Sequence, residues 1–276
     1  AGHGTGLGLS LSKDIVVAGE FDGEFDLGGG TLQPTGGITF FMAKFDQNGN
    51  HVWSKRFTTS APFAYNLSGL ETGADGQSVL YGQLLDTVDF GNGALVSAGQ
   101  SDVFLARFDG NGNALWSHNY GDSLAQVAGD VALGSSGQIA VTGATFGEID
   151  FGGGALSAIS DYDPFVAVVN SAGNHIWSKI FTGASNQYGG DVVWASNQDL
   201  LVAWNGSGTL DFGGGPRPIS GPTSGQWLTR FFGGSGTYRW STTVVSSTYM
   251  TAQIAEDNGD LVLAGGLAGD IDFRGG

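Results

Sequence analysis

Residues 103–117 read VFLARFDGNGNALWS: an apolar run, a polar turn, and a second run that ends in tryptophan and serine. An Asn-Gly pair between two such runs is the strongest short-range signal for a β-hairpin, because glycine reaches the positive φ angles that the turn requires. Residues 40–54 and 165–178 follow the same plan. The sequence therefore predicts a hairpin that recurs along the chain.

Two independent markers give the period of this recurrence. An aspartate precedes a glycine-rich loop five times, and its positions are separated by 63, 61, 61 and 61 residues: Asp26, Asp89, Asp150, Asp211 and Asp272. A Trp-Ser pair follows four of these loops at intervals of 63, 61 and 63 residues: Trp53, Trp116, Trp177 and Trp240. A fixed period of this length is typical of repeat architectures.

Each repeat predicts four antiparallel strands and almost no helix, because no stretch keeps a 3.6-residue period with helix caps. We place the repeats in one domain of residues 1–276, at 4–66, 67–126, 127–187 and 188–249, with a partial fifth at 250–276. A four-stranded sheet is too thin to bury both faces alone, and radial packing of such sheets gives a β-propeller. We therefore predict an all-β propeller with four full repeats and a half repeat; a sandwich or a solenoid is the alternative.

The composition agrees with many short strands and tight turns. The chain has 50 glycines but only 6 prolines, with 41% hydrophobic and 12% aromatic residues, which argues against disorder and against collagen. It has no cysteine, so disulfides and thiolate metal sites are excluded. No apolar run approaches the roughly 20 residues of a membrane-spanning helix, and we predict no membrane insertion.

The formal net charge is −16, from 26 acidic and 10 basic residues. A field of this sign repels phosphate backbones, so we predict no nucleic-acid partner, and it disfavours anionic membrane surfaces. It attracts cations, so bound Ca²⁺ is one reading. The other is that acidity keeps an exported β protein soluble and its strand edges apart.

Residues 163–181 read DPFVAVVNSAGNHIWSKIF, and a Gly-Asp strand and an apolar strand ending in Thr-Gly or Ala-Gly recur between such segments. This pattern resembles bacterial β-propeller repeat proteins of the seven-bladed, SBBP-like type over essentially the whole chain. The resemblance implies an exported or surface-anchored bacterial protein, in a family where such repeats often lie inside larger polypeptides.

The ends of the sequence add two expectations. Residues 1–6 lack the charged and apolar regions of a signal peptide, so we expect any such peptide to be removed or to lie outside this sequence. The strand count gives four repeats and the first two strands of a fifth, so we expect a stretch of a longer protein, or self-association through the unpaired half blade.

The repeated aspartates Asp26, Asp89, Asp150, Asp211 and Asp272 have two readings. Each could be a ligand for a cation or a sugar hydroxyl. Alternatively, each carboxylate accepts hydrogen bonds from the glycine turn while the next aromatic residue fills the gap between blades, which is the reading we favour. The turns at 46–50 and 109–113 resemble the start of a calcium loop, with oxygen-bearing residues at alternate positions, but hairpin chemistry explains them better.

The four tryptophans of the Trp-Ser pairs predict interlocking between blades, because each holds the same position in an apolar strand. Three others crowd into the fourth repeat, and there we would look first for an aromatic ligand site: Trp194, Trp204 and Trp227. No catalytic cluster, metal triad, P-loop or dinucleotide motif is present, so we predict no catalytic residue, no confident metal site and no cofactor apart from the Ca²⁺ reading.

These features favour a non-catalytic, exported propeller that serves binding, adhesion or surface assembly, with a protein or a glycan as ligand. One alternative is a structural repeat in a fibre or surface layer. The other is a glycan-active or quinone-dependent enzyme, which would break the repeat symmetry to build a single site; the fourth repeat departs most.

Overall fold

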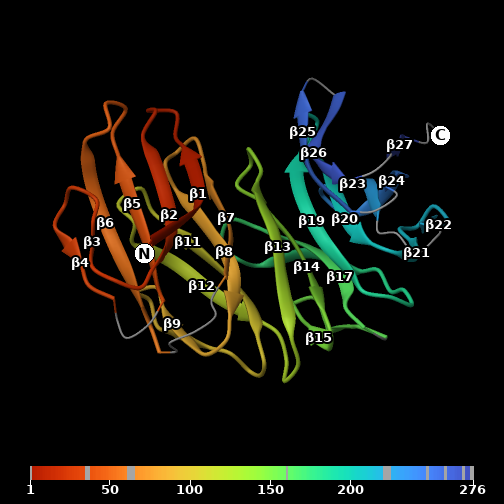
Figure 1. Cartoon of the computed structure of the whole chain (residues 1–276), viewed down its shortest axis with the longest axis horizontal. Helices are drawn as coiled ribbons and strands as arrows, with labels where there is room; N and C mark the ends of the chain where they lie inside the picture. Colours follow the sequence, from red (N-terminus) through yellow and green to blue (C-terminus); the bar gives the residue numbers. More distant parts are fainter. Residues whose placement is uncertain are drawn as a thin grey trace. The chain divides into compact units, whose positions relative to one another are not determined.

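The computed structural model describes residues 2–34, 38–60, 66–159, 161–219, 225–246, 249–257, 260–268 and 271–273. In this part of the chain every regular element is a strand, and no helix is present that is long and apolar enough to cross a membrane. The strands form four-stranded antiparallel sheets, one for each of the four full repeats, which confirms the all-β prediction with propeller-like blades (Figure 1).

The first two repeats have the same order of six strands. The first contains β1 (Gly2–Leu9), β2 (Ile15–Phe21), β3 (Phe25–Asp26), β4 (Thr31–Leu32), β5 (Thr39–Phe45) and β6 (His51–Thr59). The second contains β7 (Asn66–Thr72), β8 (Ser78–Leu84), β9 (Thr87–Asp89), β10 (Ala94–Val96), β11 (Asp102–Phe108) and β12 (Ala114–Tyr120).

The next two repeats follow the same order. The third contains β13 (Gln126–Leu133), β14 (Ile139–Thr145), β15 (Glu148–Ile149), β16 (Leu156–Ser157), β17 (Asp163–Val169) and β18 (His175–Ile180). The fourth contains β19 (Gln187–Trp194), β20 (Asp199–Gly206), β21 (Gly208–Asp211), β22 (Pro216–Ile219), β23 (Gly225–Phe232) and β24 (Thr237–Ser246). The start of the fifth contains β25 (Tyr249–Asp257), β26 (Asp260–Ala268) and β27 (Ile271–Phe273).

Each large sheet uses four of the six strands in chain order, for example β1-β2-β5-β6 and β13-β14-β17-β18. The other two strands are short and form a hairpin around the aspartate-glycine loop. The sequence pattern predicts only a loop at this place. This hairpin also joins repeats, because β9 pairs with β6 and β27 pairs with β24 of the preceding repeat. A propeller-like blade here thus shares its outer edge with the next repeat.

The hairpin of the third and fourth strands forms as predicted. In the first three repeats two backbone hydrogen bonds close the turn, for example from the Asp109 N–H to the Asn113 carbonyl and from the Gly112 N–H to the Asp109 carbonyl. The donating glycine has a positive φ in each of them: Gly49, Gly112 and Gly173 at +80°, +72° and +80°. Gly236 holds the same place in the fourth repeat, at +65°. Left-handed backbone is strained for other residues, which explains the recurring glycine.

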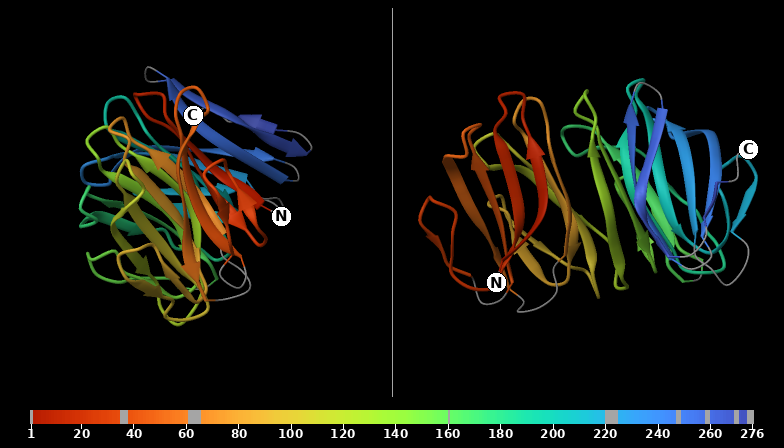
Figure 2. Two further views of the ribbon diagram at one scale, coloured as in Figure 1. Left: turned by 90° about the vertical axis from the view of Figure 1, so that its left-hand side faces the viewer. Right: turned by 45° about the horizontal axis from the view of Figure 1, so that its top comes forward.

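The described structure divides into two compact units, residues 1–128 with 135–137, and residues 129–134 with 138–276. In the first unit the sheets of repeats 1 and 2 share one core (Figure 2). It contains Val16, Phe40 and Met42 from the first sheet and Leu70, Leu80 and Phe104 from the second. In the second unit repeats 3 and 4 share a second core, and repeat 4 packs against β25–β26 in a third.

Candidate functional site

The Trp-Ser tryptophans link neighbouring repeats within each unit. Trp53 on β6 donates its indole N–H to the carbonyl of Gly110, in the turn of the second repeat, at 3.1 Å. Trp177 on β18 donates in the same way to Gly233 in the fourth repeat, at 2.6 Å. A Cβ atom on Gly112 or Gly236 would meet these rings at 2.8 and 2.5 Å. The predicted interlock is therefore confirmed for Trp53 and Trp177.

The repeated aspartates hold their own glycine loops. The carboxylate Oδ1 of Asp26 accepts the N–H groups of Gly28 and Gly30, at 2.7 and 3.1 Å. Asp89, Asp150 and Asp211 make the same pair of bonds in the next three repeats. This is the capping role that the sequence favoured. The side chain of Asp272 lies outside the described residues.

In the second and fourth repeats the aromatic residue after the aspartate fills the gap between sheets, as predicted. Phe90 packs against Phe40 and Phe57 of the first repeat, with ring centroids 6.5 and 5.1 Å away. Phe212 packs against Phe181, at the end of the third repeat, at 4.9 Å. The loop thus positions one ring at each of these two interfaces.

The turns that resemble calcium loops use their oxygen atoms internally. Asp46 Oδ1 accepts the backbone N–H groups of Asn48 and Asn50, and Oδ2 accepts the Asn50 side-chain amide at 2.8 Å. Asp109 makes the same three bonds with Asn111 and Asn113. The hydrogen bonds from Asn50 lower the pKa of Asp46. Among the described residues no group of three or more acidic or histidine side chains could hold a metal ion.

The tryptophans of the fourth repeat lie inside the protein. Trp204 and Trp227 are fully buried, and their indole N–H groups donate to Thr229 Oγ1 and to the Arg217 carbonyl. Trp194 is half-buried and donates to the carbonyl of Ala132 at 3.2 Å. The faces of Trp204 and Trp227 are covered by protein, so this structure places them in a core and not on a surface that a ligand could reach.

One pair of positions differs between the repeats. In the first and third repeats a histidine ring lies over the middle glycine of the loop: a Cβ atom on Gly29 would lie 2.0 Å from His51 Cε1, and one on Gly153 would lie 2.2 Å from His175 Cε1. Tyr238 covers Gly214 in the fourth repeat. These rings leave no room for a side chain at the loop.

In the second repeat the larger side chain stands in the loop and the smaller one on the strand. Asn92 stands where the others have glycine, and Ala114 stands where they have the ring. Asn92 Oδ1 accepts a hydrogen bond from Ser117, the serine whose counterparts Ser178 and Ser241 bond to His175 and Tyr238. The amide therefore replaces the ring's polar contact, while the space beside Ala114 stays open.

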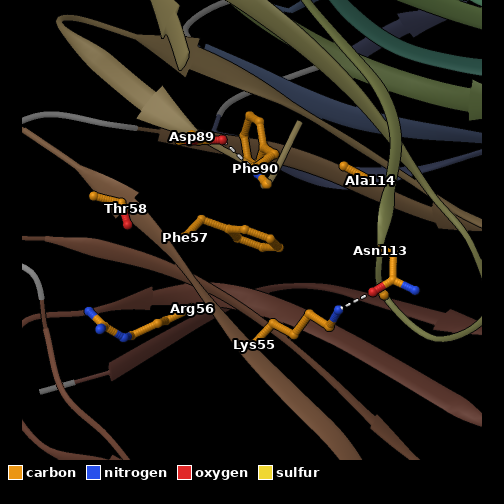
Figure 3. A pocket seen from close by; sticks show the side chains of 10 residues that line it. Lys55, Arg56, Phe57, Thr58, Asp89, Phe90, Asn113 and Ala114 are labelled. Atoms are coloured by element: carbon orange, nitrogen blue, oxygen red, sulfur yellow. Dashed lines mark hydrogen bonds between the residues drawn. The ribbon is translucent and has the colours of Figure 1, made fainter. Parts of the chain in front are cut away.

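A pocket lies at this place, between the first two repeats, with a volume of about 470 Å³ (Figure 3). Its walls come from β6, from the aspartate-glycine loop of the second repeat and from the turn before β12. They comprise Lys55, Arg56, Phe57, Thr58, Asp89, Phe90, Gly91, Gly112, Asn113 and Ala114. The sequence singled out the loop and turn residues for other reasons, but not this pocket.

Lys55 and Arg56 both belong to the lining, but they alternate along β6: Lys55 pairs with Met42 on the side that faces the second repeat, and Arg56 pairs with Phe41 on the opposite side. Lys55 is half-buried and its ammonium group donates to Asn113 Oδ1 at 2.6 Å, while the Arg56 side chain is exposed. Figure 3 shows the Lys55 ammonium pointing to Asn113, with the rings of Phe57 and Phe90 between the two walls. On the pocket side β6 therefore contributes one cation, Lys55, which lies across from the carboxylate of Asp89 in the loop.

A second polar site joins the first strands of repeats 3, 4 and 5. Asp130 on β13 accepts the N–H of Val192 at 3.0 Å, and Asp191, the same position one repeat later, accepts the N–H of Ile254. The Asp130 carboxyl group also forms a hydrogen bond with the Asp191 carboxyl group. Burial, followed by this bond, raises the pKa of Asp130 to about 8.

The Asp130 carboxyl group makes the stability of the second unit depend on pH. Because its pKa is higher in the folded chain than its ordinary value of 3.8, its contribution is fully present below about pH 4 and is lost as pH rises through about 8. Asn at this position still accepts from Val192 and donates to Asp191, but has no proton to lose. We expect Asp130→Asn to raise the free energy of unfolding at pH 8 by about 1–3 kcal/mol.

Urea unfolding of both proteins at pH 4.5 and 8 tests this prediction. The stability difference between Asp130→Asn and the original chain should be small at pH 4.5 and grow toward pH 8. Asp26→Asn, which changes an exposed carboxylate that caps its own loop, serves as the control. A difference for Asp130→Asn that stays constant with pH would contradict the raised pKa of Asp130.

Neither a comparison with models of known protein families nor a search of curated proteins finds a match for this chain. Its class therefore comes from its own structure. It is an all-β repeat protein with propeller-like, four-stranded blades, interlocked by tryptophans, with a pocket beside Lys55 in one of its interfaces.

Proposed function

We propose that this chain is a non-catalytic binding protein, and that its ligand carries a negatively charged group held in the pocket beside Ala114. The observation that carries the proposal is the exchange of Asn92 and Ala114 in the second repeat. The repeats are otherwise alike at these positions, so one interface has an opening where others have a ring.

The chemistry of the pocket indicates the type of ligand. A carboxylate accepts well from an ammonium group such as that of Lys55, and such charge-assisted hydrogen bonds are stronger than neutral ones. Thr58 and the exposed Asn113 can bond to hydroxyl groups, and Phe57 and Phe90 provide an apolar wall. An acidic sugar offers all three features, so we propose a uronate-bearing glycan as ligand.

The setting of the protein is part of the same proposal. The Asp-x-Phe-Val-Ala pattern and the Trp-Ser segments resemble bacterial propeller repeats of the SBBP-like type, which implies export or attachment to the cell surface. Acidic glycans are abundant outside cells. Binding or adhesion there fits a protein whose net charge of −16 would keep it away from such glycans except beside an available cation such as Lys55.

Calorimetric titration with galacturonate oligosaccharides tests the ligand. We expect Lys55→Ala to weaken binding about tenfold, or about 1.4 kcal/mol, and added salt to weaken it further. Arg56→Ala, on the opposite side of β6, should have a smaller effect. Lys179→Ala is the matched control, because Lys179 holds the position of Lys55 in the third repeat, next to a loop that Tyr238 covers. Neutral galactose oligosaccharides should not bind.

A double variant tests the pocket itself. Asn92→Gly with Ala114→His gives the second repeat the pair found in the first and third, so we expect a folded protein with a narrower pocket and weaker binding. If oligouronates bind the original chain and this variant equally, or bind equally after Lys55→Ala, the pocket is not the site.

A further inference from the structure

The outer face of the first sheet, the face turned away from the second repeat, is apolar. Along β1 the side chains alternate: a Cβ atom on Gly6 or Gly8 would meet Leu70 or Thr72 of the second repeat within 2.5 Å. Leu7 and Leu9 therefore point the other way, and they are 65% and 60% exposed. Leucines this exposed, side by side on one strand, are a patch of the kind that marks an interaction surface.

The rest of this face has the same character. Leu7 and Leu9 pair with Val17 and Ile15 on β2, and Ile15 pairs in turn with Phe45 on β5. These three neighbours are only partly buried. The described side chains that alternate onto this face from β1, β2 and β5 carry no charge, and β6 adds the cation of Arg56, which pairs with Phe41, in a protein of net charge −16. A second acidic chain can approach here without facing carboxylates.

In the second and fourth repeats the corresponding face is covered by the preceding sheet. Sixty-three residues on, the counterparts of Leu7, Val17, Phe41 and Phe45 in the second repeat are Leu70, Leu80, Phe104 and Phe108. All four are buried under the first sheet. In the fourth repeat Val192 and Val202 hold the places of Leu7 and Val17 and lie in the core shared with the third. The face is thus the receiving side of a sheet-to-sheet interface.

The matching donor side is exposed on β26 of the fifth repeat. In the first repeat the donor side is formed by Val16 and Ala18, which pack on the second repeat. Their counterparts in the fifth repeat are Val262, which is 51% exposed, and Ala264, which is also exposed. The neighbours Leu261 and Leu263 point the other way and pack against the fourth repeat.

We propose that the chain associates head to tail: the face of β26 that carries Val262 and Ala264 packs on the Leu7–Leu9 face of a second copy. The contact repeats, between two chains, the packing of Val16 and Ala18 on Leu70 and Leu80 within one. Two different surfaces meet, so the interface is heterologous and each copy keeps one free surface of each kind. This surface is separate from the pocket and does not depend on the proposed ligand.

Analytical ultracentrifugation of the 276-residue chain tests the proposal, because association through such an interface rises with concentration from single copies to dimers and longer oligomers. We expect Leu7→Lys to abolish association by placing a charge on the receiving face, and Val262→Lys to abolish it from the donor face. Leu115→Lys, at a leucine that is also exposed but lies on β12, is the control and should associate like the original chain.

Mixing the two disabled variants gives the decisive result. Leu7→Lys keeps its donor face and Val262→Lys keeps its receiving face, so the mixture should form a one-to-one dimer and nothing larger. Unchanged circular dichroism shows that both variants fold. The proposal is overturned if the original chain stays a single copy up to about millimolar concentration, or if the mixture of variants stays unassociated.

Discussion

Replacing Trp177 with alanine is expected to lower the free energy of unfolding by about 3–5 kcal/mol, the usual cost of removing a large buried aromatic side chain. The ring is 7% exposed, lies against Gly236 of the next repeat and contacts Phe231 at 6.2 Å between centroids. Its N–H is bonded to the Gly233 carbonyl at 2.6 Å. The variant would lose packing and a buried hydrogen bond together.

Trp177→Phe separates the two contributions. Phenylalanine keeps part of the apolar contact but leaves the carbonyl without its donor, so we expect a loss of about 1–3 kcal/mol. Ile159→Ala, at an exposed residue of the same unit, should change stability by less than about 0.5 kcal/mol. Urea unfolding measures all three. If Trp177→Ala cost no more than Ile159→Ala, the indole would not hold the repeats together.

Replacing Gly153 with alanine is expected to cost about 1–3 kcal/mol, because the new methyl group would lie 2.2 Å from His175 Cε1. The backbone at Gly153 is not left-handed, so the cost comes from the collision alone. Removing the ring should relieve it. In Gly153→Ala with His175→Ala we expect the glycine substitution to become nearly neutral, which gives a coupling energy above about 1 kcal/mol.

Gly154, one residue on, is the matched control. An alanine Cβ atom there would meet nothing within 4 Å, but φ is +107°, so Gly154→Ala costs backbone strain. That cost should be the same whether residue 175 is histidine or alanine. The pair Gly153→Asn with His175→Ala, which copies Asn92 and Ala114, should fold with stability close to the original. Equal costs of Gly153→Ala on both backgrounds would show that the ring does not restrict the loop.

The origin of the pocket could have been found in the sequence, but only by reading two positions together. Each of Asn92 and Ala114 alone is an ordinary difference between repeats. The two residues lie close together because β12 passes beside the loop between β9 and β10. In the other repeats a Cβ atom on Gly29, Gly153 or Gly214 would clash with the ring above it, which explains why the two positions change together. A residue-by-residue alignment of the repeats, searched for compensating changes in size, would have shown the signal.

The three extra tryptophans of the fourth repeat are conspicuous in the sequence, but two of them lie in a core. Trp194, Trp204 and Trp227 stood out in the sequence because they break the repeat, and an extra tryptophan on a surface would suit a sugar. Trp204 and Trp227 occupy directly paired positions on β20 and β23, on the side that faces the third repeat. Whether an added indole fills a core or lines a site depends on which side of the sheet the neighbouring repeat covers.

The sequence by itself determined the period of the repeat, the hairpins, the glycine turns with their aspartate caps, and the linking role of the Trp-Ser tryptophans. These features depend on contacts within a few residues, or on a position that recurs in every repeat, so the pattern records them directly. Only the tertiary structure decided where the pocket opens, that burial and the neighbouring Asp191 raise the pKa of Asp130, and which apolar faces remain uncovered. Those depend on side chains about 60 residues apart that meet only when one sheet packs on the next, and no local pattern specifies that distance.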